Sequence, residues 1–115
     1  MEYSLTKDSD ALICLLYKDY CDARSTGTPK DKAKKFGNSR MINDNYVPKW
    51  SFQDCLETCR ELNRAGLIDC LYGDGEIIIS SITDQGIIYM EGRFSRNVSS
   101  ILDHIKTIKD LVPFV

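Results

Sequence analysis

The feature that most constrains the fold is an amphipathic segment followed at once by two short β-prone runs. Ser51 is a typical helix N-cap, and the apolar residues after it share one helical face: Phe52, Cys55, Leu56, Cys59, Leu62 and Ala65. Gly66 followed by Leu67 is typical of a Schellman helix ending. Residues 67–72 and 76–82 are β-prone, and Gly73-Asp74-Gly75 between them allows the positive φ angles of a tight turn. The pattern predicts a helix that leads directly into a β-hairpin.

Apolar spacing and capping residues predict the other helices, which cover residues 8–23, 30–36, 83–91 and 97–111. The second of them is short and very basic, and Thr28-Pro29 begins it. Residues 39–50 follow neither period, and Pro48 disfavours helix just before it, so we interpret this stretch as a connecting loop. A chain of 115 residues, 43% of them hydrophobic, suits one domain over residues 1–115. We expect the α+β class.

Two short motifs resemble the winged helix-turn-helix domain. Leu62-Asn63-Arg64-Ala65-Gly66-Leu67-Ile68 resembles its helix-to-strand transition, and Ile82-Thr83-Asp84-Gln85-Gly86 resembles the start of its next helix. More narrowly, residues 50–111 resemble the YjcQ-like family of small bacterial and phage-associated proteins, including Ile105-Lys106-Thr107-Ile108-Lys109-Asp110 in the last helix. The connection over 39–50 departs from the pattern, because a compact helix-turn-helix has a turn of about three or four residues.

The resemblance implies a three-helix core, a two-stranded wing and additional C-terminal helices. It also implies a role in DNA-related regulation of transcription, without an established ligand. In a winged helix the third helix enters the major groove, and the second helix, the wing and loops contact phosphates.

The charge of the chain is unevenly distributed. The net charge is −2, but residues 24–49 hold seven basic and two acidic residues, a local charge of +5 that leaves −7 for the remainder. Such a segment suits contacts with double-stranded DNA, and it is equally typical of a well-solvated helix and loop. We expect DNA contacts from Lys30, Lys32, Lys34, Lys35, Arg40, Lys49, Gln53, Arg60 and Arg64. Carboxylates oppose them on the third helix and around the wing tip: Asp54, Glu57, Glu61, Asp69, Asp74 and Glu76. The first hypothesis is therefore a DNA-binding regulator whose basic second helix holds phosphates.

The alternative hypothesis is a winged-helix protein-interaction module that has no DNA contacts. The acidic wing favours it, and so does the last predicted helix, 97–111, which carries a 3-4-3-4 apolar stripe: Val98, Ile101, Ile105, Ile108 and Val112. The stripe predicts either a homodimer seam or a helix that folds back onto its own core.

Several kinds of chemistry are not expected. One histidine and no catalytic signature predict a protein that is not an enzyme, with no catalytic residue and no cofactor. An odd number of cysteines, five, without a secretion signal predicts reduced thiols and a cytoplasmic protein. No apolar run approaches the ~20 residues of a membrane span, so we expect no membrane partner.

No metal site is expected either. Cys55 and Cys59 are four residues apart, and Cys70 or His104 would have to complete a zinc site with them. Cysteines on an apolar helical face are most often buried core residues. His104 lies beside Asp103 on the polar half of its helix, and we expect it to be solvated.

Overall fold

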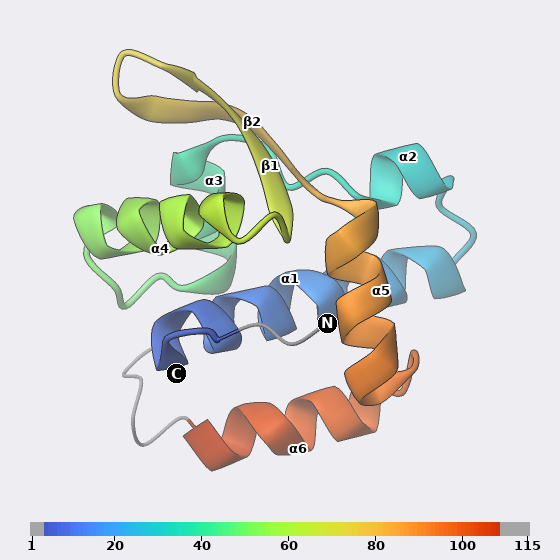
Figure 1. The fold of residues 1–115 in the computed structure, drawn as a ribbon. Helices are drawn as coiled ribbons and strands as arrows, with labels where there is room; N and C mark the ends of the chain where they lie inside the picture. The colour runs from blue at the N-terminus through green and yellow to red at the C-terminus, as the bar shows by residue number, and fades with distance from the viewer. Residues whose placement is uncertain (1–3, 109–115) are drawn as a thin grey trace.

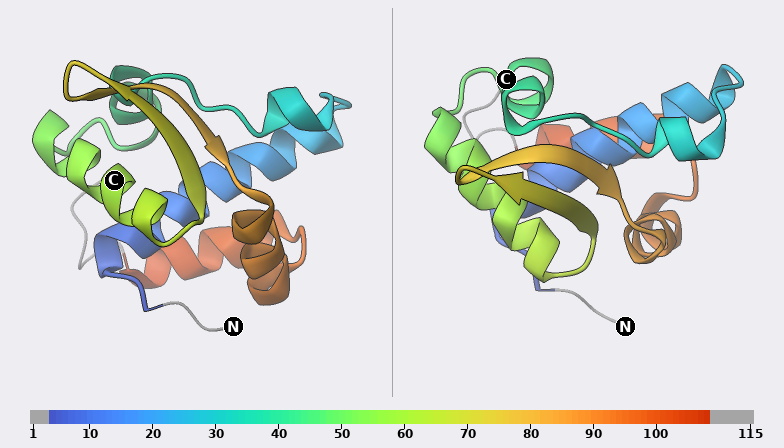
Figure 2. Two further views of the ribbon diagram at one scale, coloured as in Figure 1. Left: turned by 45° about the horizontal axis from the view of Figure 1, so that its top comes forward. Right: turned by 90° about the horizontal axis from the view of Figure 1, so that it is seen from above.

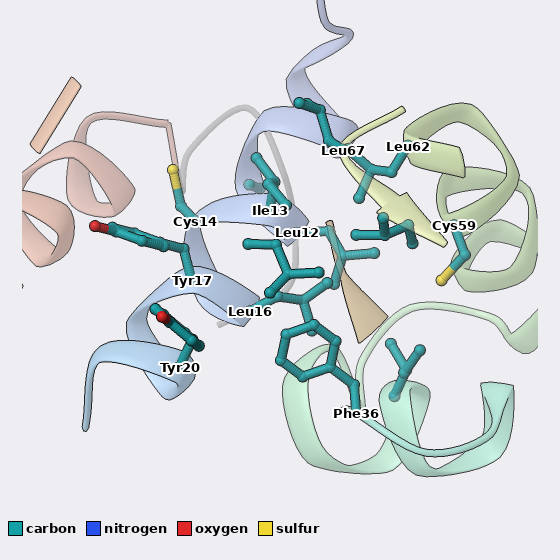
Figure 3. Packing of buried hydrophobic residues seen from close by; sticks show 14 of the residues in the cluster. Leu12, Ile13, Cys14, Leu16, Tyr17, Tyr20, Phe36, Cys59, Leu62 and Leu67 are labelled. Carbon is teal, nitrogen blue, oxygen red and sulfur yellow. The ribbon is translucent and has the colours of Figure 1, made fainter. Parts of the chain in front are cut away.

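The first helix, α1 (Lys7–Ser25), runs through the middle of the molecule and contacts all five other helices of the described chain. The computed structural model describes residues 4–108. The Thr6 side chain caps α1 by accepting a hydrogen bond from the Ser9 N–H at 3.1 Å. Leu12, Leu16 and Tyr17 are fully buried. Figure 3 shows Leu12 and Leu16 on the side of α1 nearer to Leu62 of α4, and Tyr17 pointing away from α4. The helix predicted over 8–23 is confirmed. Its apolar residues lie on most of its sides, and a helix of this kind is buried in a core.

The other elements lie around α1, as Figures 1 and 2 show. They are α2 (Lys30–Ala33), α3 (Ser39–Tyr46), α4 (Phe52–Arg64), β1 (Ile68–Gly73), β2 (Glu76–Ile82), α5 (Asp84–Phe94) and α6 (Val98–Ile108). α3, α4 and the hairpin cover one side of α1, α6 covers the opposite side, and α5 connects the two. Helices and one two-stranded antiparallel sheet make the protein α+β, as expected. Within residues 4–108, no helix is both long enough and apolar enough to cross a bilayer.

The predicted passage from α4 into a hairpin is confirmed. The Ser51 hydroxyl accepts from the Asp54 N–H at 3.1 Å, which caps the first turn of α4. At the other end Gly66 has a φ of +79°, and the Leu67 N–H donates to the Leu62 carbonyl at 3.1 Å. This Schellman geometry turns the chain directly into β1.

β1 and β2 pair antiparallel in the predicted places. Gly73 pairs with Glu76, so the loop is the two residues Asp74 and Gly75, which have φ angles of +53° and +77°. Two consecutive positive φ angles are typical of a type I′ turn, whose twist matches that of the strands. The register shifts beside Leu71, where Ile78 is an extra residue on β2.

The prediction of a loop over 39–50 is wrong, because residues 39–46 form α3. Asn38 caps this helix by accepting from the Met41 N–H at 2.9 Å, and Ile42 is fully buried. Pro48 lies beyond the last residue of α3, so it ends the helix instead of preventing it. The true connection between α3 and α4 is the short turn over 47–51.

The basic helix predicted over 30–36 is only partly formed, because α2 ends at Ala33. Lys34 is the C-cap of α2, and the chain then lies along the outer edge of β2. The Phe36 N–H donates to the Ser80 carbonyl at 3.0 Å, and the Ile82 N–H donates to the Lys34 carbonyl at 2.9 Å. Sheet pairing overrides the helical tendency of this stretch.

The apolar stripe of the last helix folds back onto the same chain. Ile101 and Ile105 are buried, and α6 packs along α1. Val112 lies outside the described residues. Two side chains of the predicted homodimer seam, Ile101 and Ile105, are therefore used within one chain.

We predict that Gly86→Ala destabilises the protein and that Gly92→Ala does not, although both glycines lie in α5. A Cβ at Gly86 would lie well inside van der Waals contact of the Leu67 carbonyl oxygen, whereas one at Gly92 would meet nothing within 4 Å. Urea unfolding should show a loss of roughly 1–3 kcal/mol for Gly86→Ala. Gly92→Ala should be neutral or stabilise by up to about 1 kcal/mol, because alanine favours helix. Equal effects of the two changes would contradict the close approach.

Candidate functional site

The exposed side of α4 carries a line of four side chains that we call the α4 stripe: Gln53, Glu57, Arg60 and Arg64. Arg64 approaches the Glu57 carboxylate at 3.3 Å and Arg60 approaches it at 3.8 Å. One acidic residue therefore neutralises part of the charge of two arginines. Exposed pairs of this kind contribute at most about 1 kcal/mol each, so an incoming anion can compete for either guanidinium.

A hollow of about 410 Å³ lies between the α4 stripe and the hairpin. Arg60, Asn63, Arg64, Tyr72 and Gly75 line it. The Arg60 guanidinium donates to the Gly75 carbonyl at 3.0 Å, and the Asn63 amide donates to the Tyr72 hydroxyl at 3.2 Å. Asn63 also accepts from the Cys70 N–H at 3.2 Å. These bonds hold the hairpin at a fixed position over α4.

Glu61, another carboxylate of α4, contacts the N-terminal end of α1. Glu61 accepts hydrogen bonds from the hydroxyls of Thr6 at 2.7 Å and Ser9 at 2.9 Å. Burial, followed by the nearby charges of Glu61 and Asp54, raises the pKa of Asp8. One of the carboxylates expected to repel DNA, Glu61, thus belongs to the contact between α4 and the N-terminal end of α1.

The basic residues predicted to contact DNA are not on one surface. Lys30 and Lys32 are exposed on α2, which follows the C-terminal end of α1, whereas Glu61 binds its N-terminal end. The 19 residues of α1 separate these ends by about 28 Å. The Lys34 ammonium is 2.8 Å from the Asp84 carboxylate, so its charge is already paired.

The rest of the predicted basic set lies nearer the hairpin and α4. Lys35 forms a bridge to Ser81 on β2. The Arg40 guanidinium lies 3.7 Å from the centre of the Phe52 ring and 3.5 Å from the Glu76 carboxylate. Lys49 is exposed in the turn before α4. The structure brings Arg60 and Arg64 together, but it does not bring the basic helix to them.

The outward side of the hairpin carries an apolar surface that the sequence analysis missed. Leu71, Ile78 and Ile79, which we call the hairpin face, are 58%, 52% and 51% exposed. Leu71 and Ile79 are directly paired across the strands, and the Ile78 side chain covers Gly73. The run of isoleucines over 77–79 was a usable signal, because side chains alternate between the two faces of a regular strand and such a run cannot all be buried on one face. The extra residue at Ile78 interrupts this alternation, so Ile78 and Ile79 are both exposed.

A half-buried polar cluster joins α1, α5 and α6, and it corrects the expectation that His104 is solvated. Asp10 of α1 lies 2.6 Å from an Arg93 nitrogen and 2.8 Å from His104 Nε2. Arg93 also lies 3.0 Å from His104 Nε2, and the Cys14 thiol donates to Asp10 at 3.7 Å. We call these four residues the Asp10 cluster. Sequence reasoning missed the cluster because its members are up to 94 positions apart.

The five thiols are free, as predicted for reduced cysteines. Cys55 and Cys59 are buried in the core face of α4. Burial, the first cause in both cases, raises the pKa of Cys14 to about 12 and that of Cys70 to about 11. None of these observations supports a nucleophilic cysteine.

Comparison of the chain with protein-family models, curated proteins and solved structures gives no match. Its function is therefore inferred from its own residues.

We predict that Asp10→Asn destabilises the protein more at pH 7 than at pH 3. Burial alone would raise the pKa of Asp10, but hydrogen bonds from Arg93 and His104 outweigh burial, and the pKa lies below its ordinary value. A carboxyl whose pKa is lower in the folded state stabilises the folded protein at pH values above its unfolded-state pKa of about 3.9. This stabilisation is lost as the pH falls through the folded-state pKa.

Urea unfolding with EDTA present should show a loss of roughly 1–3 kcal/mol at pH 7 that shrinks below about pH 4. Asp44→Asn, at an exposed position, is the control and should have little effect at either pH. A loss of equal size at both pH values would contradict the ionic role of Asp10.

Proposed function

We propose that this chain is a winged-helix domain of the YjcQ-like kind that acts as a protein-interaction module, with the hairpin face as its docking surface. The observation that carries the function is the exposure of three large aliphatic side chains on one small hairpin. Such a cluster is costly in water unless a partner covers it.

The order of the elements supports the winged-helix part of the proposal. α3 and α4 form a helix pair with a short turn over 47–51, and the hairpin follows α4 directly. The connection over 39–50 looked too long for a helix-turn-helix in the sequence, but most of it is α3, and the turn that remains is short. Both motif glycines are required by the backbone. Gly66 has a positive φ angle, and Gly86 packs closely against the Leu67 carbonyl.

The surroundings of the hairpin favour its face over its edges for docking. The outer edge of β2 is bonded to residues 34–36, and on β1 the Cys70 N–H is bonded to Asn63. A partner that adds a strand would find these groups already occupied. The hairpin face has no such cover from any described residue.

Charge defines the kind of partner. Asp69 and Asp74 are exposed beside the hairpin face and form no ion pair with any described residue. We infer that the partner is a protein with an apolar patch bordered by lysine or arginine. The same carboxylates would repel the phosphates of DNA at the wing.

We predict that Leu71→Ser combined with Ile79→Ser abolishes partner binding without unfolding the protein. Both side chains are more than half exposed, so their loss should change stability by no more than about 0.5 kcal/mol each. Partners captured by cross-linking are identified by mass spectrometry, purified and titrated by calorimetry. The double variant should weaken binding at least about tenfold.

The matched control is Ile88→Ser on α5, where the isoleucine is 63% exposed and lines a hollow with residues of α1, α2 and α5 instead of the hairpin. It should bind within about twofold of the wild type. Binding that the double variant retains at full strength, or that Ile88→Ser loses equally, would reject the hairpin face as the docking surface. Added salt should weaken the complex, because the two aspartates contribute to it.

DNA binding is a second candidate, and the position of Arg60 and Arg64 beside one hollow favours it. Guanidinium groups suit phosphate oxygens, and the Tyr72 ring offers an apolar surface next to them. In this proposal the α4 stripe, rather than α2, would make the principal contacts.

We predict that, if DNA binds in this way, Arg64→Glu weakens binding of a labelled duplex at low salt several-fold more than Lys32→Glu. Both residues are exposed and the charge change is the same. Arg64 is on α4, which contacts the N-terminal end of α1 through Glu61, whereas Lys32 is on α2, which follows the C-terminal end of α1. Lys34 is unsuitable for the comparison because it pairs with Asp84. Fluorescence anisotropy measures the effect. No binding at low salt, or greater sensitivity to Lys32→Glu, would exclude the α4 stripe as a DNA site.

A further inference from the structure

The Asp10 cluster brings together three side chains that ligate metals. Asp10 and Cys14 are one turn apart on α1, and His104 reaches them from α6. One ligand atom from each of the three residues lies within 4.8 Å of the other two. No other group of three such side chains within residues 4–108 is this close. The cluster is separate from the hairpin face and from the α4 stripe.

The donor set suits Zn²⁺. Carboxylate oxygen, imidazole nitrogen and thiolate sulfur all bind this ion, at about 2.0–2.3 Å. Tetrahedral bonds of that length place ligand atoms roughly 3.3–3.6 Å apart. The Asp10 oxygen and His104 Nε2 are 2.8 Å apart, so adjustments of about 1 Å would give the required spacing. A water molecule in the fourth position would complete the tetrahedron, as in other zinc sites with three protein ligands.

The hydrogen bonds of His104 supply an independent indication. Its Nε2 lies 2.8 Å from an Asp10 oxygen, which needs a donor, and 3.0 Å from an Arg93 nitrogen, which needs an acceptor. One ring nitrogen either carries a proton or offers a lone pair, so it cannot satisfy both neighbours. A cation between Nε2 and the Asp10 oxygen would use the lone pairs of both atoms.

One guanidinium nitrogen of Arg93 occupies the space beside His104 Nε2 that the cation would need, and there is room for this nitrogen to move. The bond of Arg93 to the other oxygen of Asp10, at 2.6 Å, can remain and orient the carboxylate, as hydrogen bonds to ligating groups commonly do. Only the second guanidinium nitrogen must leave Nε2. A hollow of about 140 Å³ lined by Leu5, Asp10, Tyr89 and Arg93 adjoins it. The rings of Tyr89 and Phe94, at 5.5 and 4.8 Å, already face the guanidinium.

We propose that Asp10, Cys14 and His104 bind Zn²⁺ and that the ion fastens α6 to α1. Binding releases the Cys14 thiol proton to solvent and uses the Nε2 lone pair of a neutral His104. Because the thiol must lose its proton to bind the ion, affinity should increase with pH. The sequence analysis expected no metal, since it grouped His104 with Cys55 and Cys59 instead of with Asp10 and Cys14.

The test uses Co²⁺ as a spectroscopic substitute for Zn²⁺ in the full chain, after treatment with EDTA. We expect one equivalent of Co²⁺ to bind, with visible bands of four-coordinate cobalt and a near-ultraviolet thiolate charge-transfer band. Cys14→Ser should remove the charge-transfer band, and His104→Gln should weaken Zn²⁺ binding at least tenfold. Zn²⁺ should raise the melting temperature of the wild type but not that of His104→Gln.

The matched control is Cys21→Ser, which changes another buried cysteine of α1 outside the cluster. It should bind Co²⁺ like the wild type. Circular dichroism shows whether each variant is folded. If Cys14→Ser does not fold, Zn²⁺ binding by His104→Gln tests the proposal instead. Absence of a stoichiometric Co²⁺ complex, or binding that folded His104→Gln keeps at full strength, would overturn the proposal.

Discussion

The backbone of Gly66 and Leu67 is the junction on which the rest of the structure depends. Thr83 donates to both residues, through its hydroxyl to Gly66 and through its N–H to Leu67 at 3.0 Å. The base of the hairpin and the start of α5 are thereby fixed at one point, beside the end of α4. Gly86 allows α5 to approach the Leu67 carbonyl closely. The hairpin lies over α4, and α5 leads back to α1, because these backbone groups satisfy one another.

In the folded domain, several charged side chains that the sequence places on the surface are paired with other side chains. Sequence alone counts Glu57, Glu61 and Lys34 as surface charges, but each has a partner within the domain. The free carboxylates that remain beside the hairpin border an apolar face instead of a basic one. A protein surface with complementary charge fits that combination better than a polyanion does. The arginines beside the hollow are the exception, and they are the part of the domain best suited to phosphate.

The success of the sequence predictions depended on how local the determining interaction was. The cap at Ser51, the ending at Gly66 and the Asp74-Gly75 turn involve neighbours in the chain, and all three are found. The stretch over 34–36 failed because its partner, β2, lies more than 40 residues away. The prediction missed α3 because Pro48 disfavours helix only in the residues just before it, whereas the Asn38 cap starts a helix that ends at Tyr46. His104 was misplaced because the pattern of one helix does not reveal what packs against it.

The sequence by itself determined the α+β class, the boundaries of α4 and the hairpin after it, because capping, turn geometry and apolar periodicity act over a few residues. Only the tertiary structure decided where the charges lie relative to one another. It separated the exposed lysines of α2 from the arginines of α4, left three aliphatic side chains exposed on the hairpin, and placed Asp10 and Cys14 against His104. These outcomes follow from contacts between residues tens of positions apart, which hydrophobic burial selects without leaving a local pattern.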